Sequence, residues 1–303
     1  MKFDDSDSWA ILSEIEKSIK SKIDAVGTPL KDWDIQINFG IKTGFNDAFI
    51  IDSQTKDEIL SKCTSAYERV RTTEIIRPIL RGRDIKRYSY QYAGLYLIST
   101  FPAKGYDIDD YPAVKDYLLK FGIERLEQTG KEHIINGERV KARKKTSNKW
   151  YETQDSISYW DLLSQPKIIW GEISDKSKFC IDLHGRYVPE ATTFMLSGEN
   201  LIYLLAFLNC SVSEYLFSII GTTTGVGTVR WKKYKILELP VPKSIPNDLY
   251  SQLLEVCSQT IESSDNDSNE SKINSIIYQV YGLSEDEIEF IESKIYPSKH
   301  SSL

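Results

Sequence analysis

The chain has 303 residues, of which 41% are hydrophobic and 12% aromatic, so it can bury a sizeable core and is not disordered as a whole. No apolar run approaches the roughly 18 residues that a membrane-spanning helix needs. The acidic N-terminus is unlike a signal peptide. We therefore expect a cytoplasmic protein with no membrane partner.

The formal net charge of −6 conceals a basic region. Residues 69–149 contain 18 Lys and Arg against 10 Asp and Glu, which is a net of +8 and leaves −14 for the remaining residues. Local potential governs binding to a polyanion more than net charge does, so this segregation is compatible with a nucleic-acid partner. Charge alone leaves open that the cluster is a solvated face without a partner.

The first half of the chain is predicted to begin with a helix and continue as strands. Apolar spacing predicts a helix over 8–26, capped by Ser8 and ended by Gly27 and Pro29. From Trp33 the period changes to two, which predicts a hairpin of strands at 35–39 and 48–51. A helix is expected from Pro112 to Leu126. Further strands are expected at 74–80, 95–100, 167–173, 178–183 and 192–196.

After Leu196 the pattern becomes helical. Asn200 can cap a helix over 201–208, and Ser211 with Glu214 forms a capping box for a second; both should pack on the sheet. A Gly/Thr stretch at 221–228 and a strand at 235–241 lead to Pro240-Val241-Pro242, where regular pairing stops. Further helices are expected at 247–262, 270–281 and 284–295, the last with a capping box of Ser284 and Glu287.

These elements predict an α+β fold in three parts. An N-terminal helix or connector occupies 1–30, a mixed β-sheet domain with packed helices occupies 31–242, and a small C-terminal helical region occupies 243–303. The four cysteines lie far apart, without the spacing of a zinc site, and are expected to be free and mostly buried thiols.

No catalytic constellation is evident in the sequence. The three histidines form no HExxH pair, no GxSxG elbow is present, and residues 221–228 fit neither phosphate-binding fingerprint. An Asn-Pro-Pro-aromatic motif and a glycine-rich loop for S-adenosylmethionine are also missing. Asp286 with Glu292-Ser293-Lys294 is the nearest match to a nuclease site, but it falls within a predicted amphipathic helix, where such combinations are common. We expect neither catalytic nor metal-binding residues, and no cofactor, in this chain.

Two segments combine cations with residues able to contact bases. Residues 139–151 hold six cations and two adjacent aromatics without apolar periodicity, and residues 77–87 hold five cations around Gly82 and Asp84. Cations neutralise phosphates, while Asn, Arg and aromatic side chains reach bases. The alternative for 139–151 is a flexible loop whose Trp150 and Tyr151 pack on the core. The candidate DNA-binding residues are Lys42, Thr43, Asn46, Arg77, Arg81, Arg83, Lys86, Arg87, Lys141, Arg143, Lys144, Lys145, Asn148, Lys149, Trp150, Lys232 and Lys233.

Six strings, in this order, together resemble the TaqI-like C-terminal specificity domain of single-chain restriction-modification enzymes and adenine-N6 methyltransferases. They are GIKTGFNDAFII at 40–51, RPILRGRDI at 77–85, YPAVK at 111–115, KWYE at 149–152, PKIIW at 166–170 and LLAFLN at 204–209. The leucine-rich helix pair, residues 221–230 and LPVP at 239–242 also resemble recognition domains of type I specificity subunits.

The resemblance implies that residues 31–242 form a DNA target-recognition domain, which grips double-stranded DNA while a methyltransferase domain flips the target adenine. S-adenosylmethionine, and Mg²⁺ if a nuclease is present, are then expected on that partner domain or subunit. Two alternatives stay open: a stand-alone metal-dependent nuclease, and a relic or interaction protein. Whether the chain is a fragment, a split subunit or a relic also stays open.

Overall fold

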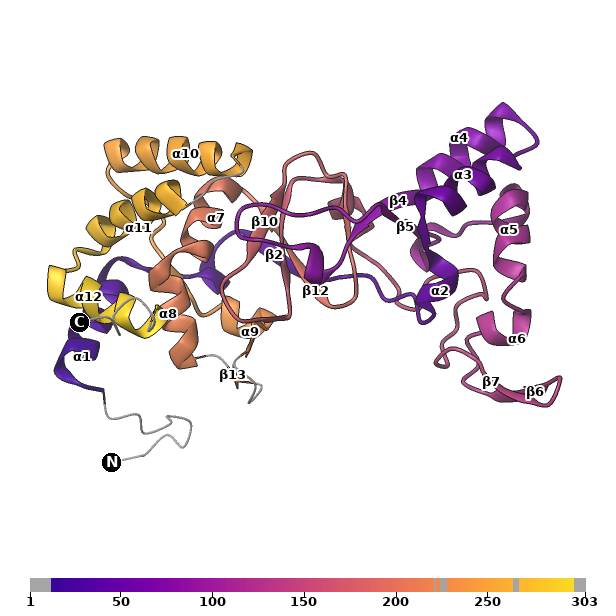
Figure 1. Ribbon diagram of the computed structural model, residues 1–303, viewed down its shortest axis with the longest axis horizontal. Helices are drawn as coiled ribbons and strands as arrows, with labels where there is room; N and C mark the ends of the chain where they lie inside the picture. Colours follow the sequence, from indigo (N-terminus) through magenta and orange to yellow (C-terminus); the bar gives the residue numbers. More distant parts are fainter. Residues whose placement is uncertain (1–11, 221, 224–227, 264–266, 297–303) are drawn as a thin grey trace. The chain divides into compact units, whose positions relative to one another are not determined.

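The structure is a computed structural model that describes residues 12–220, 222–223, 228–263 and 267–296. By contacts between residues, the chain divides into two compact units that interleave in sequence. The sheet unit consists of residues 34–201 and 223–233, and the helical unit of residues 1–33, 202–222 and 234–303. Helices accompany several small sheets of parallel and antiparallel strands (Figure 1), which confirms the predicted α+β fold with a C-terminal helical region.

The first sheet of the sheet unit has the strand order β10-β8-β12-β2 and is antiparallel throughout. Both faces of its inner strands are buried, so β8 and β12 are nearly continuous apolar runs rather than alternating ones. Trp170 of β8 stacks on Phe194 of β12 with ring centroids 5.4 Å apart. The strands are β10 (Phe179–Asp182), β8 (Lys167–Gly171), β12 (Thr193–Gly198) and β2 (Ile35–Phe39).

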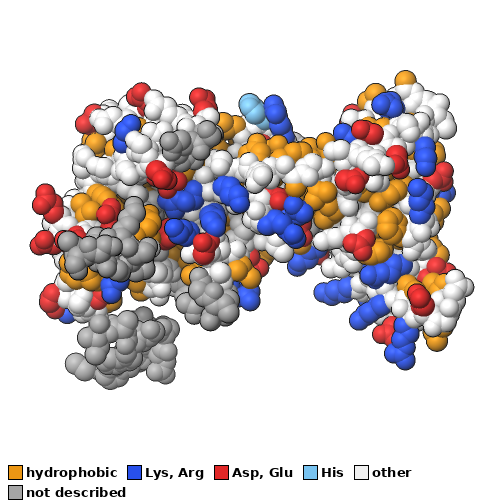
Figure 2. Space-filling view, in the orientation of Figure 1, with side chains coloured by type: hydrophobic (Ala, Val, Ile, Leu, Met, Phe, Trp, Pro, Cys, Tyr) orange, Lys and Arg blue, Asp and Glu red, His pale blue; other side chains and the backbone are white. Residues whose placement is uncertain are grey.

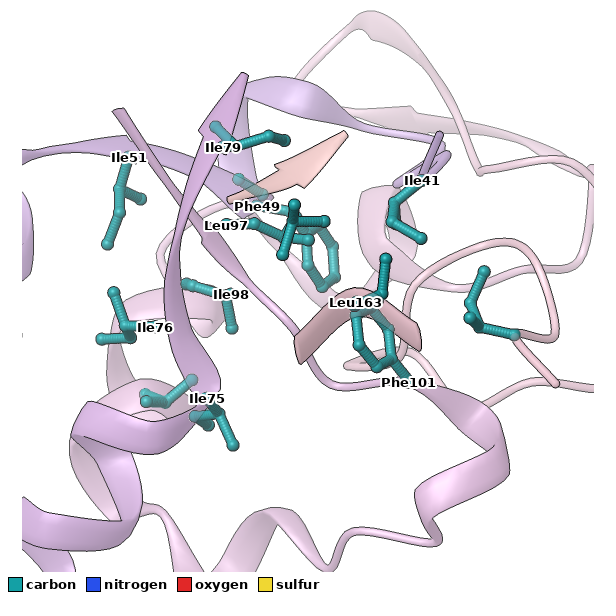
Figure 3. Packing of buried hydrophobic residues seen from close by; sticks show 14 of the residues in the cluster. Ile41, Phe49, Ile51, Ile75, Ile76, Ile79, Leu97, Ile98, Phe101 and Leu163 are labelled. Carbon is teal, nitrogen blue, oxygen red and sulfur yellow. The ribbon is translucent and has the colours of Figure 1, made fainter. Parts of the chain in front are cut away.

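The second sheet has the order β11-β4-β5-β3, with β11 parallel to β4 and the other pairs antiparallel. Its core is apolar: Ile79 of β4, Leu97 of β5 and Phe49 lie against one another and are fully buried (Figure 3). Because these residues leave water together, they hold the sheet to the helices around it. The strands are β11 (Val188–Pro189), β4 (Ile76–Leu80), β5 (Leu95–Ile98) and β3 (Ile50–Asp52).

Short helices and two small strand pairs complete the sheet unit (Figure 1). Asp52 caps α3 and Ser65 caps α4, each by accepting a hydrogen bond from a backbone N–H in the first turn. The helices are α2 (Asn46–Phe49), α3 (Ser53–Ser61), α4 (Ala66–Ile75), α5 (Pro112–Leu119) and α6 (Ile123–Leu126). The strand pairs are β6 (Glu132–Ile135) with β7 (Glu138–Lys141), and β9 (Ile173–Ser174) with β14 (Val229–Arg230).

A buried ion pair joins β8 to β10. The Lys167 ammonium donates to the Asp182 carboxylate at 2.8 Å, and both side chains are excluded from solvent. Asp182 also accepts from the backbone N–H groups of Arg186 and Tyr187, so the pair fixes the turn that follows β10. Such a pair is tolerated in the interior because hydrogen bonds satisfy both ions.

The helical unit packs α10 along α11, and α8 against α12 and α11. The rings of Tyr203 and Phe207 in α7 contact those of Tyr250 and Tyr281, which lie in α10 and α11. A short pair of β1 (Thr28–Pro29) and β15 (Pro240–Val241) closes the unit. The helices are α1 (Glu14–Val26), α7 (Leu201–Asn209), α8 (Ser211–Ile220), α9 (Lys233–Ile236), α10 (Asn247–Glu262), α11 (Asp267–Tyr281) and α12 (Glu285–Ile295).

Strand pairing differs from the sequence-based expectation at three places. The predicted hairpin of 35–39 and 48–51 is wrong: β2 pairs with β12, and β3 pairs with β5 in the other sheet. The predicted strand at 235–241 is instead α9 followed by the two-residue β15. Residues 221–228 lie mostly outside the described residues, although 222–223 form the short strand β13.

The helices also depart from expectation in detail. Helix α1 begins at Glu14 with a capping box of Ser13 and Glu16, whereas Ser8 lies outside the described residues. The helix expected from Pro112 to Leu126 is broken at Gly122, whose φ of +81° is left-handed. Most of α7 and all of α8 fall in the helical unit.

Other expectations agree with the structure. Helices α10, α11 and α12 are present, and Ser284 and Glu287 form the predicted capping box. All four cysteines are free, and Cys180, Cys210 and Cys257 are buried. In the described part of the chain no single helix is long and apolar enough to cross a membrane. Helices α7 and α8 together have the required length and composition, but the pair is bent by 64°.

Glu287 joins α12 to α1 inside the helical unit. Its carboxylate accepts hydrogen bonds at 2.6 Å from both the Ser18 hydroxyl and the Lys22 ammonium, and at 2.7 Å from the backbone N–H of Ser284. Burial raises the pKa of Glu287, but these hydrogen bonds outweigh it and hold the pKa at about 2.

We predict that Glu287→Gln lowers the free energy of unfolding at pH 7 by about 2–3 kcal/mol. The pKa is lower in the folded than in the unfolded chain, so this stabilisation is complete above the unfolded pKa of about 4.3 and is lost as pH falls toward 2. Urea unfolding at a series of pH values measures it. Glu289→Gln, on the exposed side of the same helix, is the control. Equal losses in both variants at pH 7 would contradict the assignment.

Candidate nucleic-acid interface

Two shallow hollows open on the surface of the sheet unit. The amide hollow, of about 420 Å³, is lined by residues 42–47, Arg125, Gln154 and Ala191. The cation hollow, of about 520 Å³, includes Arg83, Lys86 and Lys178 in its lining. Thr192 lines the cation hollow and directly follows Ala191, which lines the amide hollow, so the two hollows are neighbours.

Among the candidate lysines and arginines, Arg143 is the most deeply buried, with 2% of its surface exposed. Its guanidinium donates to backbone carbonyls of Leu126 at 2.7 Å, Thr43 at 2.8 Å, Glu152 at 2.7 Å and Trp150 at 2.6 Å. Burial lowers the pKa of Arg143 to about 10. The side chain thus ties α6 and the 42–47 segment to residues 150–152, and we assign it to the architecture of the site.

Three further predicted arginines are held by neighbours within the fold. Arg77 donates at 3.0 Å to the Leu163 carbonyl, and burial lowers its pKa. Arg81 makes a bidentate contact to Asp84, at 3.0 and 2.7 Å. Arg87 donates to the hydroxyl of Ser177 at 2.6 Å. These contacts order the turn after β4 and the segment that approaches β10.

Polar candidates in the loops are engaged in a similar way. The Asn148 amide donates to the carbonyls of Thr153 and Gln154, at 3.2 and 2.8 Å. Thr43 is buried, and its hydroxyl donates to Asn46 at 2.6 Å. Lys233 donates to the Ile37 carbonyl at 2.7 Å. These side chains shape the loops between and around the hollows.

The remaining candidates face solvent or lie at its edge. Lys and Arg side chains gather at the end of the sheet unit that carries α6, β6 and β7 (Figure 2). Trp150 and Lys232 are half-buried, and the Trp150 ring packs edge-on against buried Tyr151. The exposed candidates are Lys42, Asn46, Arg83, Lys86, Lys141, Lys144, Lys145 and Lys149.

The structure adds residues that the sequence reasoning missed. Arg125, Gln154 and Lys178 line the hollows although none was a candidate. Arg125 lies in a segment that the apolar spacing predicts to be a core-facing helix, and nothing in the sequence around Gln154 indicates a binding residue. Only folding brings these two residues beside the 42–47 segment. Within the described residues, no group of three His, Cys, Asp or Glu side chains is placed to hold a metal ion.

The model of the TaqI-like C-terminal specificity domain matches residues 77–241, which is more than half of the chain. The chain therefore belongs to this family of specificity domains, which is related to restriction-modification enzymes and DNA methyltransferases.

Two curated relatives match nearly all of the chain. The type II methyltransferase M.BstVI of Geobacillus stearothermophilus is 25% identical over 301 residues, covering 97% of this chain and 47% of its own length. The type II methyltransferase M.PaeR7I of Pseudomonas aeruginosa is 22% identical over 288 residues, covering 93% and 44%. The chain thus spans about half the length of these relatives.

Two solved structures share the fold. The type IIL restriction-modification enzyme MmeI, determined in complex with DNA, aligns with a TM-score of 0.56 and 12% identity over 91% of this chain and 37% of that one. The type IIG restriction endonuclease BpuSI aligns with a TM-score of 0.50 and 12% identity over 89% and 34%. At this identity the likeness concerns the fold alone.

We predict that Arg143→Met destabilises the chain strongly, because each buried carbonyl left without its donor costs about 1–3 kcal/mol. Lys144→Met, at the exposed neighbouring position, should change the free energy of unfolding by less than about 0.5 kcal/mol. Arg143→Lys should fall between them, since an ammonium cannot reproduce the planar fork. Urea unfolding compares the three, and equal stability of the two Met variants would contradict the role given to Arg143.

Proposed function

We propose that this chain is the DNA-sequence-reading module of an adenine-N6 methyltransferase or restriction-modification enzyme and has no catalytic activity by itself. The observation that carries the proposal is the arrangement of exposed cations and amides around two neighbouring hollows in a specificity-domain fold. Its relatives are named as methyltransferases, and MmeI, which shares the fold, has been determined with DNA bound.

The exposed cations in and beyond the cation hollow favour contacts with the phosphates of a duplex. In the cation hollow, Glu172 already pairs with Arg230 at 2.9 Å and Asp175 with Lys178 at 2.5 Å. Arg83 and Lys86 are exposed, and with Lys144, Lys145 and Lys149 they suit phosphates. Phosphate contacts position a protein on DNA, while base contacts specify the sequence.

Methyl transfer and any cleavage are assigned to a partner domain or subunit. That partner would hold S-adenosylmethionine, together with Mg²⁺ if it includes a nuclease. In this scheme the present chain selects the site, and the partner flips and modifies the adenine.

We predict weak, strongly salt-dependent binding of the chain to duplex DNA. If about five phosphates are neutralised, the logarithm of affinity should fall with the logarithm of salt concentration with a slope near −4 to −5. Lys144→Ala and Arg83→Ala should each reduce the slope by about one. Lys62→Ala, at an exposed lysine outside both hollows and outside the basic segments 77–87 and 139–151, should leave the slope unchanged. Fluorescence anisotropy measures these slopes, and a flat salt response would remove the electrostatic argument.

We predict that the purified chain neither transfers labelled methyl groups from S-adenosylmethionine nor cleaves DNA in Mg²⁺. Adding the methyltransferase partner should give site-specific methylation of adenine. Methyl transfer by the chain alone would refute its non-catalytic role, and Mg²⁺-dependent cleavage would favour the nuclease alternative.

A further inference from the structure

The amide hollow contains two side-chain amides and one guanidinium, from three segments that are far apart in sequence. Asn46 comes from the start of α2, Arg125 from α6, and Gln154 from the loop after residue 150. Lys42 and Asp47 also line the hollow, with charges of opposite sign. The Asp47 carboxylate accepts from an exocyclic amine, which a base has and a phosphate lacks. The two amides and this carboxylate therefore suit a base edge, while Lys42 and Arg125 also suit an adjacent phosphate.

The Asn46 amide is oriented before any ligand arrives. The Thr43 hydroxyl accepts from the backbone N–H of Phe45 at 3.1 Å and donates to Asn46 Oδ1 at 2.6 Å. In this arrangement the Asn46 amide oxygen faces Thr43. The Nδ2 group has no hydrogen-bond partner within the described part of the chain and keeps both of its donors.

Two hydrogen bonds fix the backbone of Gln154, and the absence of a side chain at Gly44 leaves room for its amide. Its N–H donates to the Lys42 carbonyl at 3.0 Å, and its carbonyl accepts from the Asn148 amide at 2.8 Å. A Cβ at Gly44 would lie 2.6 Å from Gln154 Oε1, so a side chain at this position would displace the amide. Gly44 also has a φ of +76°, which disfavours any other residue.

Arg125 is fixed at the other side of the hollow. Its guanidinium lies 4.1 Å from the centre of the Phe45 ring and donates one hydrogen bond to the carbonyl of Lys141. Phe45 itself packs edge-on against Phe121. The aromatic contact keeps the cation in place without neutralising it.

We infer that the amide hollow is a base-reading site that takes the edge of an adenine, with Gln154 and Asn46 as its reading residues. The inference rests on the proposed function and says which part of the sheet unit specifies sequence. An amide that accepts from adenine N6 and donates to N7 matches that base and no other in the major groove. Arg125 positions the base from the side of α6.

The test is selection of bound duplexes from a randomised library, followed by sequencing, with the full chain as it exists here. Gln154→Glu removes the donor and keeps the size of the side chain, and a carboxylate accepts from cytosine N4. We expect one position of the selected sequence to change from adenine toward cytosine, by roughly 10-fold or more, while all other positions keep their preference. Asn46→Asp is a second variant, selected in parallel, so that the inference is still tested if one of the two does not fold.

Gln36→Glu is the matched control, because Gln36 is an exposed amide of the same unit that lines neither hollow. It makes the same change of charge and should leave every position of the selected sequence unaltered. A general loss of affinity in all three variants would indicate only repulsion from DNA and would overturn the inference.

The remaining outcomes separate this inference from the proposed function. If the wild-type chain binds no duplex at low salt, the proposed function fails and the inference fails with it. If it binds DNA but selects no consensus, or if both hollow variants keep the wild-type consensus, the hollow does not read bases although DNA binding stands.

Discussion

The candidate interface depends on one buried cation. Arg143 donates to four backbone carbonyls that come from the 42–47 segment, from α6 and from residues 150–152. Carbonyls in loops would otherwise face a hydrophobic interior without partners, which is costly, and the guanidinium has enough donors in one plane to satisfy several at once. Because it also lies 4.9 Å from the centre of the Phe49 ring, it anchors the loops to the apolar core. A basic residue of a candidate segment thus organises the loops from inside the fold.

Strands and helices were predictable where burial imposes a simple pattern. The inner strands β8 and β12 are apolar on both faces, and α10, α11 and α12 repeat apolar residues at helical spacing, so their positions follow from the sequence. Which strands pair with each other was not predictable in the same way. Strand β2 pairs with β12, which is more than a hundred residues later. Gly40 suggested a hairpin turn, yet a Cβ there would lie 1.8 Å from the Glu190 carbonyl oxygen. The glycine is required by the close approach of a distant segment.

The candidate site was predictable as a region but not residue by residue. Sequence showed where cations are dense, but it could not distinguish Arg143, which is enclosed, from exposed Lys144. The chemistry of the two side chains offers a partial rule. The enclosed or paired cations are mostly arginines, namely Arg77, Arg81, Arg87 and Arg143, and the exposed ones are mostly lysines. Guanidinium is weakly hydrated and matches several acceptors at once, whereas ammonium is strongly hydrated and stays in water. Arg83, which is exposed, and Lys233, which donates to a backbone carbonyl, are exceptions to this rule. Residue type alone therefore does not decide which cations are exposed.

The short segment from Glu190 to Thr193 sets the distance between the two hollows. It joins β11 of one sheet to β12 of the other, and Glu190 N–H donates to Leu80 while the Thr193 carbonyl accepts from Gly40 N–H, both at 2.8 Å. The Glu190 carboxylate accepts from the Thr192 hydroxyl at 2.6 Å, which tightens the turn itself. A segment bonded at both ends to strand backbones cannot shift without breaking the sheets. The residues that line the two hollows are therefore held at a fixed spacing by the backbones of both sheets, as a surface that must contact a duplex at two points requires if the proposed function holds.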